Sequence, residues 1–406
     1  MTRLNEFPNS QRRAIEVVKE VAAEKECRPF LVGGPVRDLL LGRNAFDIDL
    51  TLEEGSSTLA RALAKRLDGR VRSFPQFLTY KVTASEFPEI DIATARKERY
   101  RAPGSLPAVA PGRLKDDLMR RDFSINAIAM DLQDESLHDP ADGARDLKKR
   151  LIRVLHEKSF IDDPTRIFRA IRLASRLGFS IQQETAALLR QAVTSGALLT
   201  ASKERLWREL FLAMEEEEAP AILSALNHYH VLEALFGVKI GRRITSGLEL
   251  IRTELTVRPD LDRYVLYTGA LLRGSGASVS QLEGSGFSQK RARAAMQIAH
   301  DLPRLQKALA AAPSDRQRFR LYKSVAPEML ALLMADKPAE GEHVIRFEEF
   351  RKFKLALRGN ELEVPAGPHV ARALERTREA VFSGEIAPDQ ARSFAREMAI
   401  KYLGRE

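Results

Sequence analysis

Two carboxylates one residue apart, Asp47 and Asp49, are the feature of this sequence that could most directly do chemistry. They lie in the run FDIDL, which indicates a β-strand because its other residues are apolar. Side chains alternate along a strand, so Asp47 and Asp49 share one face and Phe46, Ile48 and Leu50 share the other. Neighbouring carboxylates repel each other unless a cation lies between them, and Mg²⁺ prefers such oxygen ligands beside phosphates. The pair predicts Mg²⁺ on Asp47 and Asp49, although a solvated strand face has the same pattern.

A pair of glycines precedes this strand. Gly33 and Gly34 follow the apolar run 29–32 and come before residues 35–41, which predicts a strand, a tight turn and a short helix that begins with proline. Such a turn lets backbone N–H groups approach a phosphate, and Arg37 can add a charged contact. An ordinary tight turn with an exposed Arg37 is the alternative.

Asp91, in the run EIDIATAR, offers a third carboxylate. In a second strand it could join Asp47 and Asp49 as a catalytic acid, since two metal ions commonly flank a phosphoryl group during its transfer. A surface position at the end of a strand is an equal alternative.

A second cluster lies in DDLMRRDFSINAIAMD, residues 116–131, an apolar and helix-compatible stretch. Arg121 could hold a triphosphate, and Asp122 could accept a hydrogen bond from a ribose hydroxyl. A salt bridge that caps a helix would explain the same two residues.

The stretch IDDPTRIFRAIRLASRLGF, residues 161–179, predicts a helix with proline in its first turn and Gly178 at its end. Four arginines recur on it at intervals of three, three and four residues, which confines them to an arc of roughly 120°. They are Arg166, Arg169, Arg172 and Arg176. Because no acidic residue lies between them, we expect an anionic ligand to relieve their repulsion, although a solvated face is the common alternative.

Asp163 and Arg166 place an acceptor beside a donor. Cytosine and adenine each present an amine donor next to a ring nitrogen acceptor, whereas guanine and uracil present the opposite order. The pair therefore predicts acceptance of C and A and rejection of G and U. Asp163 could instead simply cap the helix.

These residues need a scaffold, and the pattern predicts an α/β head. We expect strands at 29–32, 46–52, 77–83 and 89–93 and helices at 11–26 and 56–67. Residues 96–113 are rich in proline and glycine and predict a long mobile loop. From about residue 159 strand-like alternation nearly disappears, so the remainder should be helical.

Composition sets wider limits. The chain has 406 residues, enough for more than one domain, and a formal charge of +9, which favours a polyanionic partner. Its single cysteine, Cys27, allows no internal disulfide, and we expect a reducing, cytoplasmic setting and no disulfide-linked partner. Apolar runs are too short for a membrane helix, so no membrane association is expected.

Four motifs together resemble the class II tRNA nucleotidyltransferase and bacterial poly(A) polymerase family, which adds nucleotides to RNA 3′ ends without a nucleic-acid template. They are GGPVRD, FDIDL, RRDFSINA and DDPTRIFRAIRLASRLGF, in this order between residues 30 and 180. The resemblance implies a nucleotidyltransferase head at 1–145, a helical neck at 146–215, a body at 216–335 and a tail at 336–406. The loop at 96–113 and residues 357–386 are similar to members that add only part of the CCA end.

Carried onto matching positions, the resemblance implies Mg²⁺ on Asp47 and Asp49, with tRNA, CTP and ATP as partners. It also implies nucleotide contacts by a set of residues that reaches from the glycine turn to the arginine-rich stretch: Gly34, Arg37, Arg121, Asp122, Asp163, Arg166, Arg169 and Arg172. The acid before Asp163, often Glu in the family, is Asp162 here, which should matter little.

The helical part is expected to grip the tRNA backbone through basic residues, some of which could be mere surface. They are Arg242, Arg243, Lys290, Arg291, Arg293, Arg316, Arg318, Arg320, Arg351, Lys352 and Lys354. A poly(A) polymerase, and a catalytically silent RNA-binding protein, remain the alternative functions.

Overall fold

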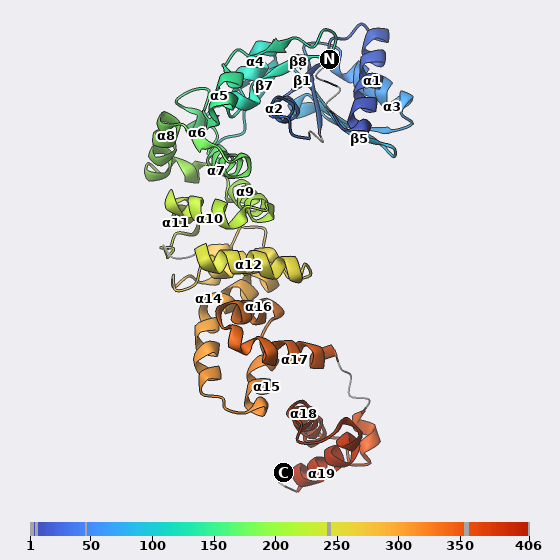
Figure 1. Ribbon diagram of the computed structural model, residues 1–406, viewed down its shortest axis with the longest axis vertical. Helices are drawn as coiled ribbons and strands as arrows, with labels where there is room; N and C mark the ends of the chain where they lie inside the picture. Colours follow the sequence, from blue (N-terminus) through green and yellow to red (C-terminus); the bar gives the residue numbers. More distant parts are fainter. Residues whose placement is uncertain (1–3, 5–6, 45–46, 242–244, 353–356, 405–406) are drawn as a thin grey trace. The chain divides into compact units, whose positions relative to one another are not determined.

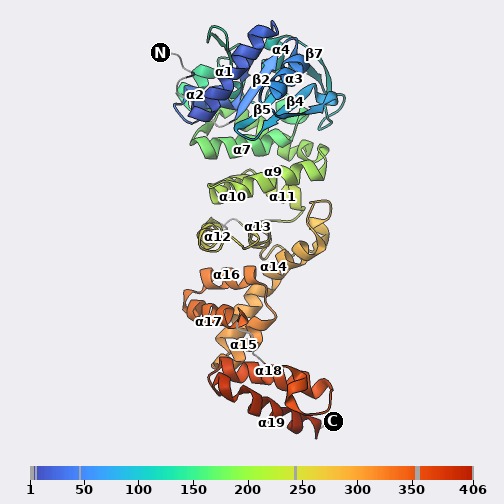
Figure 2. The same cartoon turned by 90° about the vertical axis from the view of Figure 1, so that its right-hand side faces the viewer.

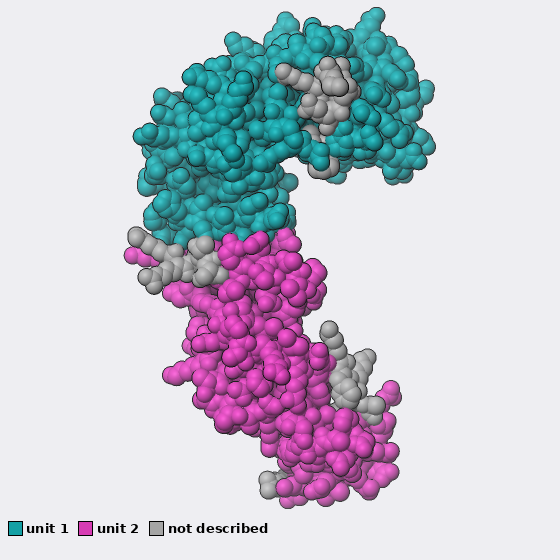
Figure 3. Space-filling model, in the orientation of Figure 1, with its two compact units in different colours: residues 1–235 teal, residues 236–406 magenta. Residues whose placement is uncertain are grey.

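The computed structural model describes residues 4, 7–44, 47–241, 245–352 and 357–404. The chain forms two compact units, residues 1–235 and 236–406, called unit 1 and unit 2 below (Figure 3). The ranges expected for the head and the neck both fall within unit 1. The finer boundaries at residues 145, 215 and 335 stay a prediction.

The described part of unit 1 contains a seven-stranded mixed sheet in the order β3-β4-β5-β2-β1-β8-β9 (Figure 1). The strands are β1 (Phe30–Val32), β2 (Ile48–Leu52), β3 (Arg70–Phe74), β4 (Thr79–Ala84), β5 (Phe87–Thr94), β8 (Ala129–Asp131) and β9 (Leu137–His138). β2 and β5 are parallel, and the other neighbours are antiparallel. The predicted acidic strand is therefore the middle strand of the sheet.

Helices α1 (Asn9–Glu24) and α3 (Ser56–Arg66) lie side by side against this sheet (Figures 1 and 2). α1 buries Ala14, Ile15, Val18 and Val21, whose spacing of one, three and three residues gives a single apolar stripe. The shorter elements that complete this part are α2 (Gly34–Leu40), η2 (Pro75–Phe77), α4 (Leu114–Met119), η3 (Ser124–Asn126) and α5 (Gly143–Lys149). α2 contacts β1, β2 and η3, which brings the glycine turn beside the acidic strand.

The rest of unit 1 is mainly helical. Its elements are β10 (Leu151–Ile152), α6 (Ser159–Asp162), α7 (Thr165–Leu177), β11 (Ser180–Ile181), α8 (Gln183–Thr194), η4 (Ala197–Thr200), α9 (Lys203–Glu215), α10 (Ala219–His228) and α11 (Val231–Phe236). α7 packs against α9 and α10, and Trp207 of α9 is fully buried. This packing fixes the arginine-bearing helix α7 through its apolar side.

Unit 2 is helical, as the sequence predicts (Figure 2). Its elements are α12 (Thr245–Val257), α13 (Arg263–Leu271), η5 (Val279–Leu282), α14 (Gln289–Ala310), α15 (Asp315–Lys323), α16 (Pro327–Asp336), η6 (Pro338–Glu340), α17 (Gly341–Lys352), η7 (Gly359–Leu362), α18 (Pro368–Phe382), η8 (Pro388–Gln390) and α19 (Ala391–Leu403). α18 and α19 pair around Leu362, Ala373, Ala395 and Ala399. Across the described ranges, no helix is both long and apolar enough to cross a membrane.

Residues 96–113 are not the long mobile loop that their composition predicts. β6 (Arg96–Arg99) and β7 (Ala108–Pro111) form an antiparallel hairpin in which Glu98 pairs with Val109. Glu98 also accepts hydrogen bonds from Arg96 and Arg120, which ties the hairpin to α4. The prediction was wrong because most of the turn-forming residues lie in the hairpin tip, at 103–107, and leave both flanks free to pair.

The stretch at 116–131 is also less regular than predicted. Residues 116–131 are divided among α4, η3 and β8, because Ser124 bonds outside the stretch, through its N–H to Arg153 and its hydroxyl to Asp146. The helix predicted in 161–179, with Pro164 in its first turn, is α7; a separate short helix, α6, comes before it, and Asp163 is extended between the two. Gly178 ends α7 at a φ of 67°, as expected.

Candidate functional site

The acidic strand has the alternation that its sequence predicts. Ile48 and Leu50 are each 1% exposed, whereas Asp47 is exposed and Asp49 is partly exposed; Phe46 lies outside the described residues. The parallel register of β2 and β5 places Asp91 directly beside Asp49. Lys81 of β4 is the next residue across, with its Nζ 3.6 Å from Asp91 Oδ1. Three carboxylates and one lysine therefore gather on this face.

The electrostatics of this face favour a cation. Burial is the largest cause that raises the pKa of Asp49 to about 6; the charges of Asp91 and Asp47 contribute to this rise, and the charge of Arg121 opposes it. Burial also raises the pKa of Asp91, and Lys81 offsets part of that rise. A cation between such carboxylates would remove the repulsion that makes their ionisation costly.

The glycine turn accommodates an arginine from the second motif. Gly33 has a φ of 75°, and a Cβ added there would lie 2.6 Å from Arg121 Nη1. Its N–H donates to the Ile128 carbonyl at 3.2 Å, so that amide is already engaged. Gly33 thus provides the left-handed turn and the space that Arg121 fills, which only a residue without a side chain can do.

Arg37 and Arg121 line the same pocket but differ in how many of their N–H groups are already hydrogen-bonded. Arg37 is 5% exposed and donates to both Asp38 oxygens and to Asn126 Oδ1, the last at 2.7 Å. Arg121 donates to Asp117 at 3.1 Å, while its buried Nε has no hydrogen-bond partner within the described part of the chain. A buried N–H donor without a partner is costly, so the Arg121 guanidinium suits an anionic ligand.

Asp122 is held by an arginine of α7. Its Oδ2 accepts from Arg169 Nε at 2.9 Å and from Nη2 at 2.5 Å, and its Oδ1 accepts from the Phe123 N–H and from Asn126 Nδ2. Burial alone would raise the pKa of Asp122, but the Arg169 charge and these hydrogen bonds outweigh it and hold the pKa well below its usual range. The carboxylate links the sheet domain to α7, and its predicted contact with a ribose stays a prediction.

Asp163 has a partner that sequence reasoning missed. Arg205 of α9 donates to Asp163 Oδ1 at 2.8 Å and to the Gly104 carbonyl at the same distance. Asp163 also accepts from the Thr165 N–H and hydroxyl at 3.1 and 2.6 Å, so its predicted capping role is present. Arg205 therefore positions both the base-reading candidate and the tip of the β6–β7 hairpin.

Arg166 is more deeply buried than a solvated stripe allows, at 5% exposed. It donates to Ser159 Oγ at 2.7 Å, to the Arg120 carbonyl at 2.9 Å and to the Tyr100 hydroxyl at 3.4 Å. Burial raises the pKa of Tyr100 to about 12, so that hydroxyl stays protonated. These contacts fix Arg166 in the wall of the pocket.

Three of the four arginines have acidic partners, and the anionic ligand expected for them stays a prediction. Arg169 pairs with Asp122, and Arg172 lies 3.3 Å from Glu209 and 3.8 Å from a second acid of the same region, Glu216. Arg176 lies 3.7 Å from Glu216 as well. The acids come from other elements, so spacing along one helix could not reveal them.

A polar pocket of about 580 Å³ brings most of the predicted site together. The predicted residues that line it are Gly33, Gly34, Arg37, Asp47, Asp49, Arg121, Asp122, Asp163, Arg166 and Arg169. Asp91 and Arg172 do not line it. Asn126, Arg205 and Glu209 do. No local pattern indicates Arg205 or Glu209, which lie on α9 and reach the site only through packing.

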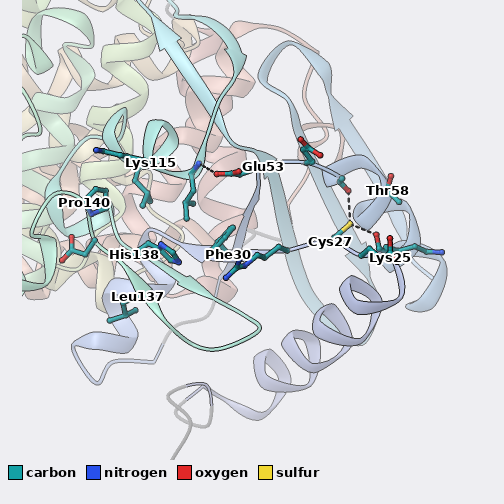
Figure 4. Close-up of a pocket in the computed structure, with 16 residues that line it drawn as sticks. Lys25, Cys27, Phe30, Glu53, Thr58, Lys115, Leu137, His138 and Pro140 are labelled. Atoms are coloured by element: carbon teal, nitrogen blue, oxygen red, sulfur yellow. Dashed lines mark hydrogen bonds between the residues drawn. The ribbon is translucent and has the colours of Figure 1, made fainter.

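A second and larger cavity, of about 970 Å³, lies elsewhere in unit 1 (Figure 4). Phe30, Cys27, Lys115 and His138 are among its lining residues, and none of the predicted site residues is. The Cys27 thiol is buried there and contacts the carbonyls of Lys25 and Gly55. Volume alone does not identify the functional site, which is defined by its charged groups.

The carboxylate oxygens of the pocket suit a hard cation that takes its remaining ligands from substrate or water. Among the described residues, no three side chains of His, Cys, Asp or Glu converge closely enough to hold a metal ion by themselves. Asp47 and Asp49 could supply two oxygens, and the rest of the coordination shell would come from phosphate oxygens or water. Mg²⁺ is commonly bound in this way, through one or two carboxylates and a substrate phosphate.

Comparison with known proteins agrees with this arrangement. Residues 29–153 match the family model described as the poly A polymerase head domain. An A-adding tRNA nucleotidyltransferase of Aquifex aeolicus is 35% identical over 81% of this chain and 41% of its own length, and one of Halalkalibacterium halodurans is 38% identical over 62% and 60%. A solved structure described as a tRNA-processing enzyme (apo form I) is 32% identical, with a TM-score of 0.74 over 92% of this chain and 98% of that chain.

A mixed sheet with acidic, glycine and arginine motifs at one pocket defines a nucleotidyltransferase-type head. The chain belongs to the class II tRNA nucleotidyltransferase and bacterial poly(A) polymerase family. It spans about 40 to 60% of the length of the curated relatives named above.

Proposed function

We propose that this protein transfers a nucleoside monophosphate from a nucleoside triphosphate to the 3′ end of tRNA and releases pyrophosphate. The observation that carries the proposal is one pocket holding the Asp47 and Asp49 carboxylates together with Arg121, whose buried Nε has no partner among the described residues. Acidic groups for a cation and a cationic group for a phosphate are the two requirements of phosphoryl transfer.

The carboxylates supply the cation site. Asp47 and Asp49 would hold Mg²⁺, whose chemistry when bound is to stabilise charge on the reacting phosphate and its leaving oxygen. Asp91, beside Asp49 on β5, raises the local negative charge and would strengthen that binding, whether or not it becomes a ligand. Lys81, which lies beside Asp91, partly offsets this negative charge.

The arginines orient the nucleotide. Arg121 and Arg37 lie beside the glycine turn and would contact the triphosphate. Arg169 bridges Asp122 to α7, so the head and the base-reading helix keep a fixed spacing. Asp163 and Arg166 would then read the base edge, and Arg205 would hold Asp163 in place.

The RNA partner is proposed from charge. Unit 2 contains 29 Lys and Arg against 21 Asp and Glu, a surplus that suits a phosphate backbone. Of the predicted basic contacts, Lys290 and Arg293 are exposed, whereas Arg291, Arg316, Arg318 and Arg320 form ion pairs with acids. Arg351 is exposed and stacks on Phe347. Arg242, Arg243, Lys354 and the Lys352 side chain lie outside the described residues.

The finer proposal is addition of AMP to tRNA that already ends in CC. The relatives that match over 62 to 81% of this chain are named A-adding enzymes, and residues 96–113 resemble those of partial-tail enzymes. A cytoplasmic location accords with this substrate and remains a proposal.

The decisive experiment supplies transcripts of one tRNA that end at the discriminator nucleotide, after C or after CC, each with one labelled nucleotide at a time. We expect one AMP on the CC end with ATP and no extension with GTP or UTP. Extension by CTP would support full or CC addition instead.

Two results would replace the proposal. A long heterogeneous product from ATP would identify a poly(A) polymerase. Binding of tRNA without any incorporation, at several Mg²⁺ concentrations, would identify a silent RNA-binding protein.

A further inference from the structure

Apolar residues also line the polar pocket. Phe77, Leu106 and Pro107 line it, and they are called the apolar rim below. Leu106 is 63% exposed, and no other strongly exposed large hydrophobic residue of the described chain lines this pocket. An exposed leucine contributes little to folding, so its position at a pocket lined by charged groups indicates contact with a bound ligand.

The hairpin tip that carries Leu106 is fixed at Gly104. The Gly104 N–H donates to the Ile161 carbonyl at 3.1 Å, and its own carbonyl accepts from Arg205 Nη1 at 2.8 Å. Gly104 is buried at a φ of 67°, and an added Cβ would lie 2.5 Å from the Thr200 backbone. Leu106 follows two residues later, so the surface it presents is held in position.

Phe77 is bound to the same hairpin. Arg96 of β6 donates from Nη1 to the Phe77 carbonyl, and Phe77 ends the short helix η2. Phe77 and the hairpin tip that carries Leu106 are thus each positioned by hydrogen bonds to the backbone. The exposed surface of Leu106 is therefore presented from a fixed part of the backbone.

Its chemistry suits the face of a nucleobase. The rim side chains offer no donor or acceptor, so they cannot read a base edge but can cover a base of any identity. The groups that can read an edge, Asp163 and Arg166, are separate members of the pocket and serve the incoming nucleotide. We propose that the apolar rim seats the 3′-terminal base of the RNA being extended, an inference that rests on the proposed function.

The test separates RNA from nucleotide. Leu106→Ala should raise the KM for the RNA about tenfold, the size expected for lost contact with one base, and leave the KM for ATP or CTP unchanged. Leu106→Met should restore most of the affinity, because methionine keeps the apolar surface. Leu199→Ala is the matched control, since Leu199 is 57% exposed in unit 1 and does not line the pocket.

A second arm uses an RNA whose last nucleotide lacks its base. If the rim seats that base, the wild type should lose about as much affinity for this RNA as Leu106→Ala loses for the normal RNA, and the two changes together should not add. Additive losses, a higher KM for the nucleotide alone, or an unchanged KM for both substrates would each overturn the proposal. Failure of the wild type to incorporate any nucleotide would instead reject the proposed function itself.

Discussion

Residues 1–235 contain 36 Lys and Arg against 35 Asp and Glu, whereas residues 236–406 contain 29 against 21. In unit 1 the charges are nearly balanced, and many of those around the pocket form ion pairs, as Arg169 does with Asp122 and Arg205 with Asp163. In unit 2 the surplus is eight positive charges. Paired charges fix geometry, while unpaired charges attract a polyanion without fixing a position.

This difference leads to opposite expectations for substitutions. Changes at the unit 1 pocket should alter rate, base choice or stability and leave the salt dependence of RNA binding nearly constant. Changes in unit 2 should alter RNA affinity and its salt dependence and leave base choice constant.

The largest effect is expected at the acidic strand. Asp49→Asn should reduce incorporation about 1,000-fold, because a metal ion contributes several kcal/mol and about 1.4 kcal/mol is a factor of ten. RNA affinity, measured by filter binding, should change less than about twofold. Asp68→Asn, an exposed position outside the pocket, is the control. Normal incorporation by the Asp49 variant would reject the proposed site.

A smaller effect is expected on base choice. Asp163→Asn should weaken discrimination against GTP and UTP about 30-fold, since one well-matched base contact is worth roughly 2 kcal/mol. Arg205→Ala should act in the same direction but less, because it only positions Asp163. Arg208→Ala, an exposed arginine on the same helix, is its control. The ratio of kcat/KM values is the measurement, and retained selectivity in both variants would place base reading elsewhere.

Removal of the Asp122 charge should lower the free energy of unfolding of unit 1 by about 2 kcal/mol. This is less than the loss expected on breaking a fully buried ion pair, because the Arg169 side chain is 42% exposed. The pKa of Asp122 is depressed in the folded protein, so its stabilisation is complete above the unfolded value of about 4 and is lost as pH falls below it. Asp122→Asn should therefore flatten the loss of stability below about pH 4 in urea unfolding. If the variant lost stability below about pH 4 as steeply as the wild type, the stabilising role of the Asp122 carboxylate would be contradicted.

The smallest effect is expected in unit 2. Lys290→Ala and Arg293→Ala should each lower RNA affinity severalfold and reduce the slope of log affinity against log salt by about 1. The incorporation rate at saturating RNA and the base preference should stay the same. Lys65→Ala, at an exposed position on α3, removes an equal charge from unit 1 and is the control. If Lys65→Ala changed the slope by the same amount, RNA binding could not be assigned to unit 2 in preference to unit 1.

Several features of the site could be predicted because they are local. Alternation along β2 separates Asp49 from Ile48 and Leu50, and the positive φ of Gly178 ends α7 where the sequence places a glycine. Each predicted motif lies within or next to a short element whose faces follow from its period, but the packing of these elements brings most of the predicted site residues into one pocket.

Other features were decided by contacts between distant residues. Arg205 reaches Asp163 from 42 positions away, and Asp122 meets Arg169 from 47 positions away. No local period encodes such pairs, so three arginines of a stripe without acids between them in sequence have acidic partners in the fold. The hairpin at 96–111 is a further case, since composition reports turn residues but not whether their flanks can pair.

The sequence by itself thus determined the side-chain chemistry and the face of each element that carries it, because both depend on residues within a few positions of one another. Only the tertiary structure decided which acid neutralises which arginine and that Gly104 fixes Leu106 at the pocket. Those outcomes depend on packing between α7, α9 and the hairpin, which brings together backbone and side chains that are far apart along the chain.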